Sequence, residues 1–217
     1  GDYRRFIPAD LPDEGMLEPH TTITDNFNRA NSATLGTSSE GWSWTETSGN
    51  IDIVSNRASN SGAFANDRAR AESDLSSSDH YAQSNWFRVN GSGNANSALV
   101  RHAAAAQTFY RYRVLAPADT GQKNRLSKSV ADILTSLANN NTPTMTDGQV
   151  GYLEINGSTL TGKLDGVQTI QVTDTAITGN LRTGIHLSGD PADITQHDNF
   201  EAADLAAGDD VTARLVD

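Results

Sequence analysis

Residues 160–170 read Leu160-Thr-Gly-Lys-Leu-Asp165-Gly166-Val-Gln-Thr-Ile170. Apolar and polar residues alternate on both sides of Asp165-Gly166. An Asp-Gly pair between two alternating segments is typical of a two-residue β-hairpin turn. The stretch therefore predicts two antiparallel strands, Thr159–Leu164 and Val167–Val172.

The rest of the chain continues this pattern of short strands separated by turns. The other segments with alternating or β-branched character are Thr21–Arg29, Ile51–Ser55, His80–Asn90, Ser97–His102, Thr108–Leu115, Val130–Leu137, Val150–Ile155, Leu181–Leu187 and Thr195–Glu201. Val130–Leu137 also fits a short helix. Roughly a dozen short strands predict a two-sheet sandwich, because a single open sheet rarely grows that large.

Composition supports an all-β domain and excludes several functions. The 217 residues are 36% hydrophobic and 20% charged, which is typical of a turn-rich β domain rather than a helical bundle. Sixteen basic against 27 acidic residues give a net charge of −11, which argues against a nucleic-acid partner. The absence of cysteine excludes disulfides and thiol nucleophiles. No apolar run reaches the roughly 18 residues of a membrane span, and the five histidines lack metal-ligand spacing, so we expect no membrane, metal or cofactor.

The two ends of the chain differ from its middle. Residues 1–20 carry three of the six prolines and show no strand or helix period, which predicts an extended arm. Within it, Tyr3, Arg4, Arg5, Phe6 and Ile7 place two cations between large apolar groups. They are either a linker end or a segment that docks on a neighbouring subunit. We expect the sandwich to span 21–203, and 204–217 to be an acidic extension that holds an added strand.

Several ordered motifs carry a resemblance to a known family. They are Asp25–Gly36, Trp42-Ser-Trp44, Ile51–Ala58, Leu153–Gly166, and Gly184–Ser188 followed by Asp198-Asn-Phe200. Together they resemble the concanavalin A-like, laminin-G-like jelly-roll domains of bacterial and phage proteins, over about Thr21 to Ala203. The resemblance implies a two-sheet antiparallel jelly-roll sandwich with an extended N-terminal arm.

The same resemblance makes the first and last strands neighbours. Phe27 and Phe200 would then both point inward, with Asp25 and Asp198 at matching offsets before them. In related domains a calcium ion bridges the termini near such positions. The more ordinary role for these two aspartates is to cap strand-end amides.

Catalytic residues are not expected. A glycosidase needs two carboxylates set roughly 5 to 9 Å apart across the scissile bond. Related glycosidases carry a Glu-x-Asp-x-Glu strand, and no strand-like stretch here holds such a set. Glu154 stands alone on its strand, while Glu14 and Glu18 lie in the arm. The sequence therefore predicts a protein that is not an enzyme.

Aromatic residues are the remaining candidates for a binding site. Trp42, Trp44 and Trp86 are candidates for a platform that stacks sugar rings, and core packing is the alternative. Arg111 and Arg113 alternate with two tyrosines, so this strand has one aromatic and one cationic face. The cationic face is either solvated or meets an acidic neighbour.

Two functions fit a complete jelly roll with extensions and no catalytic set. The first is a non-enzymatic bacteriophage structural protein, a capsid decoration or cement subunit or a tail appendage. It would sit in the virion, dock through Tyr3–Ile7 on other virion subunits, and be a homo-oligomer or lattice-bound. The alternative is a carbohydrate-binding, lectin-like module of a secreted bacterial protein, with glycans as partners.

Overall fold

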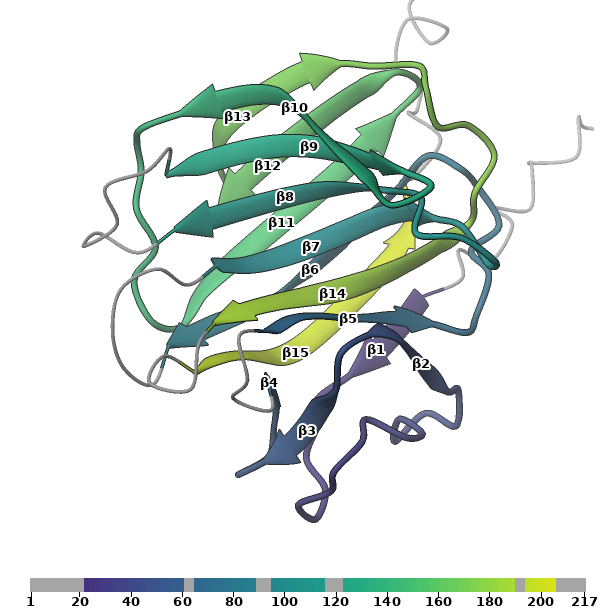
Figure 1. The fold of residues 1–217 in the computed structure, drawn as a ribbon, viewed down its shortest axis with the longest axis vertical. Helices are drawn as coiled ribbons and strands as arrows, with labels where there is room; N and C mark the ends of the chain where they lie inside the picture. The colour runs from purple at the N-terminus through teal and green to yellow at the C-terminus, as the bar shows by residue number, and fades with distance from the viewer. Residues whose placement is uncertain (1–21, 61–64, 89–94, 116–122, 190–193, 206–217) are drawn as a thin grey trace, which may run out of the picture.

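The computed structural model describes residues 22–60, 65–88, 95–115, 123–189 and 194–205. These residues form fifteen β-strands and no helix, in two antiparallel sheets packed face to face (Figure 1). Among them there is accordingly no helix long and apolar enough to cross a membrane. The predicted all-β sandwich is confirmed. The arm predicted for residues 1–20 lies outside the described residues, as does nearly all of the extension predicted for 204–217.

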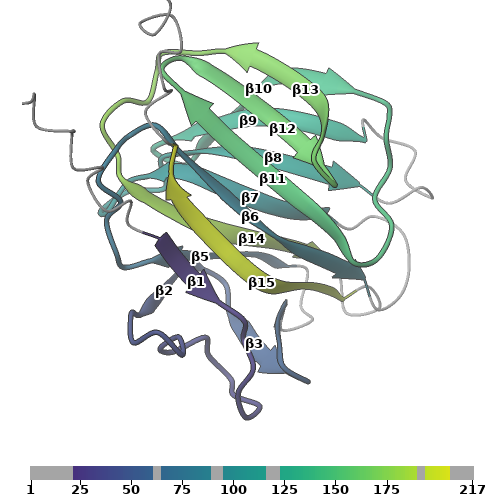
Figure 2. The same cartoon turned by 180° about the vertical axis from the view of Figure 1, so that it is seen from behind.

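One sheet has eight strands and faces the viewer in Figure 2. Its order is β13-β12-β11-β6-β15-β4-β3. Strands β1 and β4 pair with the same edge of β15, β4 along its first half and β1 along its second half. The bounds are β1 Thr22–Asp25, β3 Ile51–Val54, β4 Arg57–Asn60, β6 His80–Arg88, β11 Gln149–Asn156, β12 Thr159–Leu164, β13 Val167–Thr173 and β15 Thr195–Asp204.

The other sheet has seven strands and faces the viewer in Figure 1, in the order β10-β9-β8-β7-β14-β5-β2. The bounds are β2 Trp44–Ser48, β5 Ala65–Ala71, β7 Ala95–His102, β8 Phe109–Leu115, β9 Asn124–Val130, β10 Ile133–Asn140 and β14 Arg182–Gly189. Strands distant in sequence, such as β5 and β14, therefore lie side by side.

The hairpins predicted around Asp165-Gly166 are present. Asp165 and Gly166 take φ of 49° and 77°, the left-handed values that a primed hairpin turn requires. The residues on either side pair as β12 and β13, and β11 pairs with β12. The Asp-Gly pair thus set the turn and, through it, the register of the hairpin.

Val130–Leu137 forms strand and not helix, but a turn divides the single strand that was predicted there. Its first residue ends β9 and its later residues belong to β10, and the two strands pair across a turn at Ala131-Asp132. These two residues have φ of 50° and 68°, the conformation of a primed hairpin turn without its usual glycine. The polar strands β2, β4, β5 and β9 did not stand out in the alternation pattern.

The core lies between the sheets and contains the largest rings. Phe27 and Phe200 are both buried, and Asp25 pairs with Phe200 where β1 runs beside β15, as the resemblance implied. Trp44 meets Phe200 edge-on with ring centroids 5.0 Å apart. Further along, Trp86 packs against Tyr112 at 5.8 Å. This core holds the two sheets as one unit and leaves their outer faces for function.

Candidate functional site

Strand β8 separates an aromatic face from a cationic one. Tyr110 and Tyr112 are fully buried in the core, so Arg111 and Arg113 point to the outer face of the seven-stranded sheet. The alternation predicted for this strand is confirmed. An acidic neighbour, which the sequence left open, is present at one end of this face, where Asp132 lies 3.6 Å from Arg68.

Cross-strand pairing brings further cations to the same face. Arg125 on β9 lies directly opposite Arg113, and Arg113 lies opposite Ser97 on β7. Ser97 is opposite His186 on β14, and His186 is opposite Arg68 on β5. One row across five strands therefore reads Arg125, Arg113, Ser97, His186, Arg68. With Arg111 from the adjacent row, we call Arg68, Arg111, Arg113, Arg125 and His186 the arginine band.

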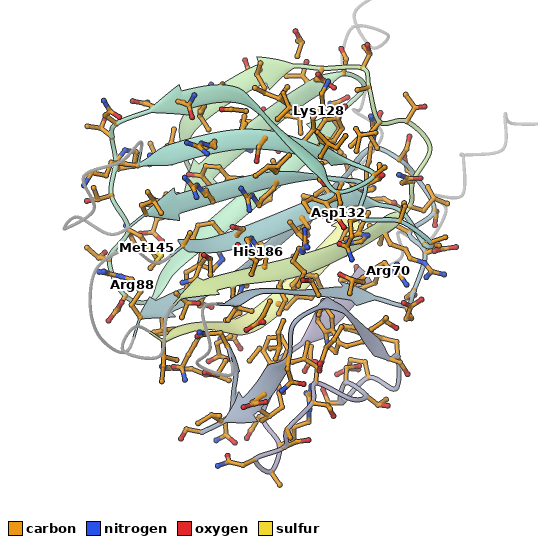
Figure 3. The ribbon with its side chains drawn as sticks, viewed as in Figure 1. Arg70, Arg88, Lys128, Asp132, Met145 and His186 are labelled. Carbon is orange, nitrogen blue, oxygen red and sulfur yellow. The ribbon has the colours of Figure 1, made fainter. Side chains whose placement is uncertain are left out.

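The outer face that carries the arginine band is recessed. The residues Ala95, Ser97, Leu99, Phe109, Arg111, Leu115, Ser127, Ser129 and His186 are all at most 7% exposed although their side chains point away from the core. Three strands separate β9 from β5, which is about 19 Å across a flat sheet. Yet Asp132, in the β9–β10 turn, reaches Arg68 of β5 at 3.6 Å. The turn therefore folds back over this face, and Figure 3 shows Asp132 and His186 on the side of the molecule where the seven-stranded sheet faces the viewer.

Arg111 is the buried centre of the arginine band. Its Nε donates to the Ser127 hydroxyl at 3.3 Å, and its Nη1 donates to Nδ1 of His186 at 3.1 Å. Both partners are neutral. Burial lowers the pKa of Arg111, and the positive charges of Arg113, Arg125 and Arg68 lower it further.

His186 is held neutral by this contact. A guanidinium only donates, so Nδ1 of His186 is the acceptor and the ring proton is on Nε2. Burial, followed by the charges of Arg111 and Arg68, holds the pKa of His186 well below its usual value. Within the described residues, Nε2 of His186 and Oγ of Ser97 are buried and have no hydrogen-bond partner. These two donors lie next to each other in the same row.

One end of this face holds a hollow of about 260 Å³ lined by Thr45, Thr47, Arg70 and residues 104–107. The β7–β8 connection forms its wall. Arg70 donates to the Ala103 carbonyl at 2.8 Å, and the Gln107 side chain donates to the Thr47 carbonyl. The Gln107 carbonyl accepts the Asp132 N–H at 3.2 Å. Hydrogen bonds to β5, to β2 and to the β9–β10 turn thus hold the wall in place.

The tryptophans predicted as a platform lie elsewhere. Trp86 is 0% and Trp44 7% exposed, and both belong to the core. Trp42 is partly buried and packs against Trp44 with centroids 5.0 Å apart. Their rings stabilise the sandwich, the alternative role that the sequence left open, and Trp44 and Trp86 present no ring face to a sugar. The residues Tyr3, Arg4, Arg5, Phe6 and Ile7 lie outside the described part of the chain.

The described strands of this sheet place no pair of carboxylates for glycoside hydrolysis on this face. The seven strands contain only two acidic residues, Glu46 and Asp67. Glu46 accepts the Leu35 N–H, and Asp67 is 1% exposed and shares its side of β5 with core residue Ala69. No strand of this sheet therefore directs a carboxylate onto the recessed face.

The opposite sheet carries a cluster that sequence reasoning missed. Tyr81 and Tyr152 stack with centroids 5.1 Å apart. Tyr81 donates to Glu201, and Tyr152 donates to Glu154, which also receives Lys163 at 2.9 Å. Burial, and then the hydrogen bonds to these carboxylates, raise the pKa of both phenols. Each polar group has a partner inside the cluster, so its members stabilise one another. Period-2 alternation in His80–Asn90 would have placed Tyr81 outward.

Asp25 has the capping role that the sequence favoured. It accepts the Phe27 N–H at 2.8 Å and the Arg29 guanidinium at 2.7 Å. Asp198 accepts the Asn199 N–H at 2.8 Å. Within the described residues no group of three or more His, Cys, Asp or Glu side chains is placed to hold a metal ion.

Comparison with known proteins supports the fold. No model of a known protein family matches the chain, and no curated protein sequence matches it. Among solved structures, the chain is similar to the carbohydrate binding module CBM66 from Bacillus subtilis, with 16% identity, 73% of this chain and 94% of that chain covered, and a TM-score of 0.57.

Two enzymes give comparable matches. A β-1,3-1,4-glucanase (lichenase) derived from a mouse hindgut metagenome has 10% identity, covers 85% of this chain and 99% of its own, and has a TM-score of 0.56. The Bacillus licheniformis β-glucanase has 9% identity, coverage of 87% and 100%, and the same score. At these identities the likeness shows the fold alone, a concanavalin A-like jelly-roll β-sandwich. The fold part of the predicted resemblance is confirmed.

Proposed function

We propose that the chain is a non-catalytic carbohydrate-binding module that holds its glycan on the outer face of the seven-stranded sheet. The observation that carries this proposal is the make-up of that face. It is recessed, and Arg, Ser and His side chains lie on it beside the apolar side chains of Ala95, Leu99, Phe109 and Leu115. Polar groups set in a recess fix the orientation of a bound ligand. The named carbohydrate binding module with this fold adds support.

The placement of the acidic residues on the strands of this sheet supports binding without hydrolysis. Both glycosidase mechanisms need a pair of carboxyl groups across the scissile bond. The two acidic residues on strands of this sheet, Glu46 and Asp67, point away from the recessed face. The described strands would therefore offer a glycan held there hydrogen-bond donors and no acid–base pair. This supports a binding role over the glucanase activity of the enzymes that share the fold.

Native affinity gels with a panel of neutral and acidic polysaccharides test the proposal. We expect retardation by at least one polysaccharide and no release of reducing ends. Arg68→Ala and Lys163→Ala form a matched pair, since each removes a cation that contacts one carboxylate and one aromatic ring, on opposite sheets. Arg68→Ala should weaken retardation and Lys163→Ala should not. The reverse result, or hydrolysis of the retained polymer, would contradict the proposal.

The virion role stays a prediction. It rests on docking by Tyr3–Ile7, which lies outside the described residues. Deleting residues 1–19 separates the two readings. Loss of assembly or of particle binding would favour the structural role, and unchanged assembly with retained glycan binding would favour the module.

A further inference from the structure

We propose that the arginine band recognises an anionic group on the glycan, so that the ligand is an acidic polysaccharide bearing carboxylates or sulfate esters. This inference rests on the proposed function and names its substrate class. The probes below separate the two sources of negative charge.

The first argument is the surroundings of Arg111. Buried charges in proteins are normally paired with an opposite charge, because removing an ion from water is costly. Arg111 is 5% exposed, and its hydrogen bonds go to the neutral side chains of Ser127 and His186. Among the described residues, the nearby charges that act on it are those of Arg113, Arg125 and Arg68, all of the same sign. A fold that needed only to be stable would place an apolar side chain here. An anionic ligand would supply the missing opposite charge.

The second argument is the set of donors around it. An arginine has five N–H groups, and Arg111 uses two of them in the contacts named above. Next to it, Nε2–H of His186 and Oγ–H of Ser97 are buried with no partner among the described residues. Buried donors are nearly always satisfied, so each unsatisfied donor needs an explanation. A carboxylate or sulfate, which only accepts hydrogen bonds, would satisfy the guanidinium, the imidazole and the hydroxyl together.

The third argument concerns access. Arg111 and His186 are buried, whereas Arg113 and Arg125 are partly exposed and the Arg68 side chain is 18% exposed. The exposure of the cations therefore increases from the floor of the recess to its surface. Partly exposed cations attract an anion over the first few ångströms, and the buried one binds it with less screening. The side chains of Arg68 and Asp132 meet over this face, so a ligand anion competes with Asp132 for Arg68.

The charge of the whole protein favours a glycan over a nucleic acid. Nucleic acids present phosphates at every step and require an extended basic surface. This chain has a net charge of −11, and only four of its 16 Lys and Arg residues belong to the arginine band. A polymer with spaced acid groups fits that distribution. Binding should weaken as salt is added, because part of the affinity is electrostatic.

The test uses the full chain and two arginine variants. Arg111→Met keeps the length of the side chain and removes its charge. Arg57→Met is the matched control, because Arg57 is a partly buried arginine on β4 of the opposite sheet, stacked on Phe87 at 3.6 Å. The probes are polygalacturonate and its fully methyl-esterified form, dextran sulfate and dextran, and sodium sulfate against sodium chloride of equal ionic strength. Binding is measured by calorimetry and thermal unfolding.

We expect the wild type to bind polygalacturonate or dextran sulfate about tenfold or more tightly than its uncharged counterpart. Arg111→Met should lose that preference, Arg57→Met should keep it, and the melting temperature of Arg111→Met should equal or exceed that of the wild type. An unchanged melting temperature separates loss of the site from loss of the fold. Preference for polygalacturonate alone assigns the carboxylate, and preference for dextran sulfate alone assigns the sulfate.

Three outcomes would overturn the inference, and they differ in what they say of the proposed function. Equal binding of charged and uncharged polymers, unaffected by Arg111→Met, leaves a glycan-binding module without an anion site. If sulfate raises the melting temperature in a way that depends on Arg111, but no polysaccharide binds, the protein has an anion site and the proposed glycan-binding function is wrong. Binding of no probe removes both.

Discussion

The buried Asp25 carboxylate accepts the indole N–H of Trp44 at 2.8 Å and so joins β1 of one sheet to β2 of the other. The same carboxylate accepts the Phe27 N–H and two N–H groups of Arg29. Its side chain is fully buried. One residue thus anchors β1, the turn that follows it, and the buried ring of Trp44.

Asp25→Asn should therefore destabilise the protein by about 3 kcal/mol, because the amide offers one oxygen where two accept donors now, and Arg29 loses its opposite charge. Asp198→Asn is the control, since Asp198 accepts one local N–H and lies 3.9 Å from Arg57. We expect it to cost less than about 0.5 kcal/mol. Urea unfolding of both variants measures the difference. Similar losses would show that Asp25 is not the anchor described here.

Structural features could be predicted from the sequence when their signal lay within a short segment of the chain. The hairpins at Asn156-Gly157 and Asp165-Gly166 could be predicted because the turn residues and alternation lie within one short segment. Strand β5 could not, because its inward side carries Asp67 beside the small residues Ala69 and Ala71 and its outward side carries Arg68 and Arg70, so no apolar stripe marks it. The turn at Ala131-Asp132 lacked glycine and was read as strand interior.

The site shows the same limit more strongly. The cationic face of Arg111 and Arg113 was visible from alternation on one strand. Its meeting with Arg125, His186 and Arg68 depends on which strands pair, and β5 and β14 are far apart in the sequence. From the sequence, this face was expected either to be solvated or to meet an acidic neighbour. Neither interpretation included the further cations that strand pairing brings to it, because a pattern within one strand does not reveal which strands lie beside it.

Buried neutral histidines should make the fold sensitive to acid. His80 donates through Nδ1 to the Ser77 carbonyl, and its Nε2 accepts the Arg101 N–H at 3.0 Å. Burial lowers the pKa of His80 from 6.5 to about 4, with Arg101 adding to the effect. The folded state thus binds fewer protons than the unfolded state below pH 6.5, so the stability is complete above that pH and is lost as the pH falls toward 4.

For His80 alone the loss is about 2 kcal/mol at pH 5. Burial lowers the pKa of His102 to about 4 as well, and it adds a similar amount. His80→Gln retains a donor and an acceptor without the titration. Between pH 7.5 and pH 5, the free energy of unfolding obtained from urea titrations should fall by about 2 kcal/mol less in this variant than in the wild type. An identical drop in both proteins would mean that His80 does not carry the acid response.

Gly151 should tolerate no side chain. A Cβ there would lie 2.0 Å from Cζ2 of Trp86, inside the ring of a fully buried side chain. Gly151→Ala should cost about 3 kcal/mol, because the indole cannot move in a packed core. Gly157→Ala is the control: its Cβ meets nothing within 4 Å, and only its φ of +57° is unfavourable, worth about 1 kcal/mol. Thermal unfolding compares the stability that each variant loses. An equal loss would show that the Trp86 side chain moves to make room for the added methyl group.

Trp86 and Trp44 should contribute to stability and not to glycan affinity. Trp86 donates to the Ser84 hydroxyl at 3.0 Å and packs on Tyr112, and Trp44 donates to Asp25. Trp86→Phe should cost about 2 kcal/mol through lost contacts and the lost donor. Its affinity for any polysaccharide that binds the wild type should stay within about twofold, because the ring is enclosed between the sheets. Arg68→Ala should show the opposite pattern, with weaker binding and a small change in stability. A folded Trp86→Phe variant that loses binding would restore the tryptophans as the sugar platform, and with them a ligand that is recognised by stacking rather than by charge.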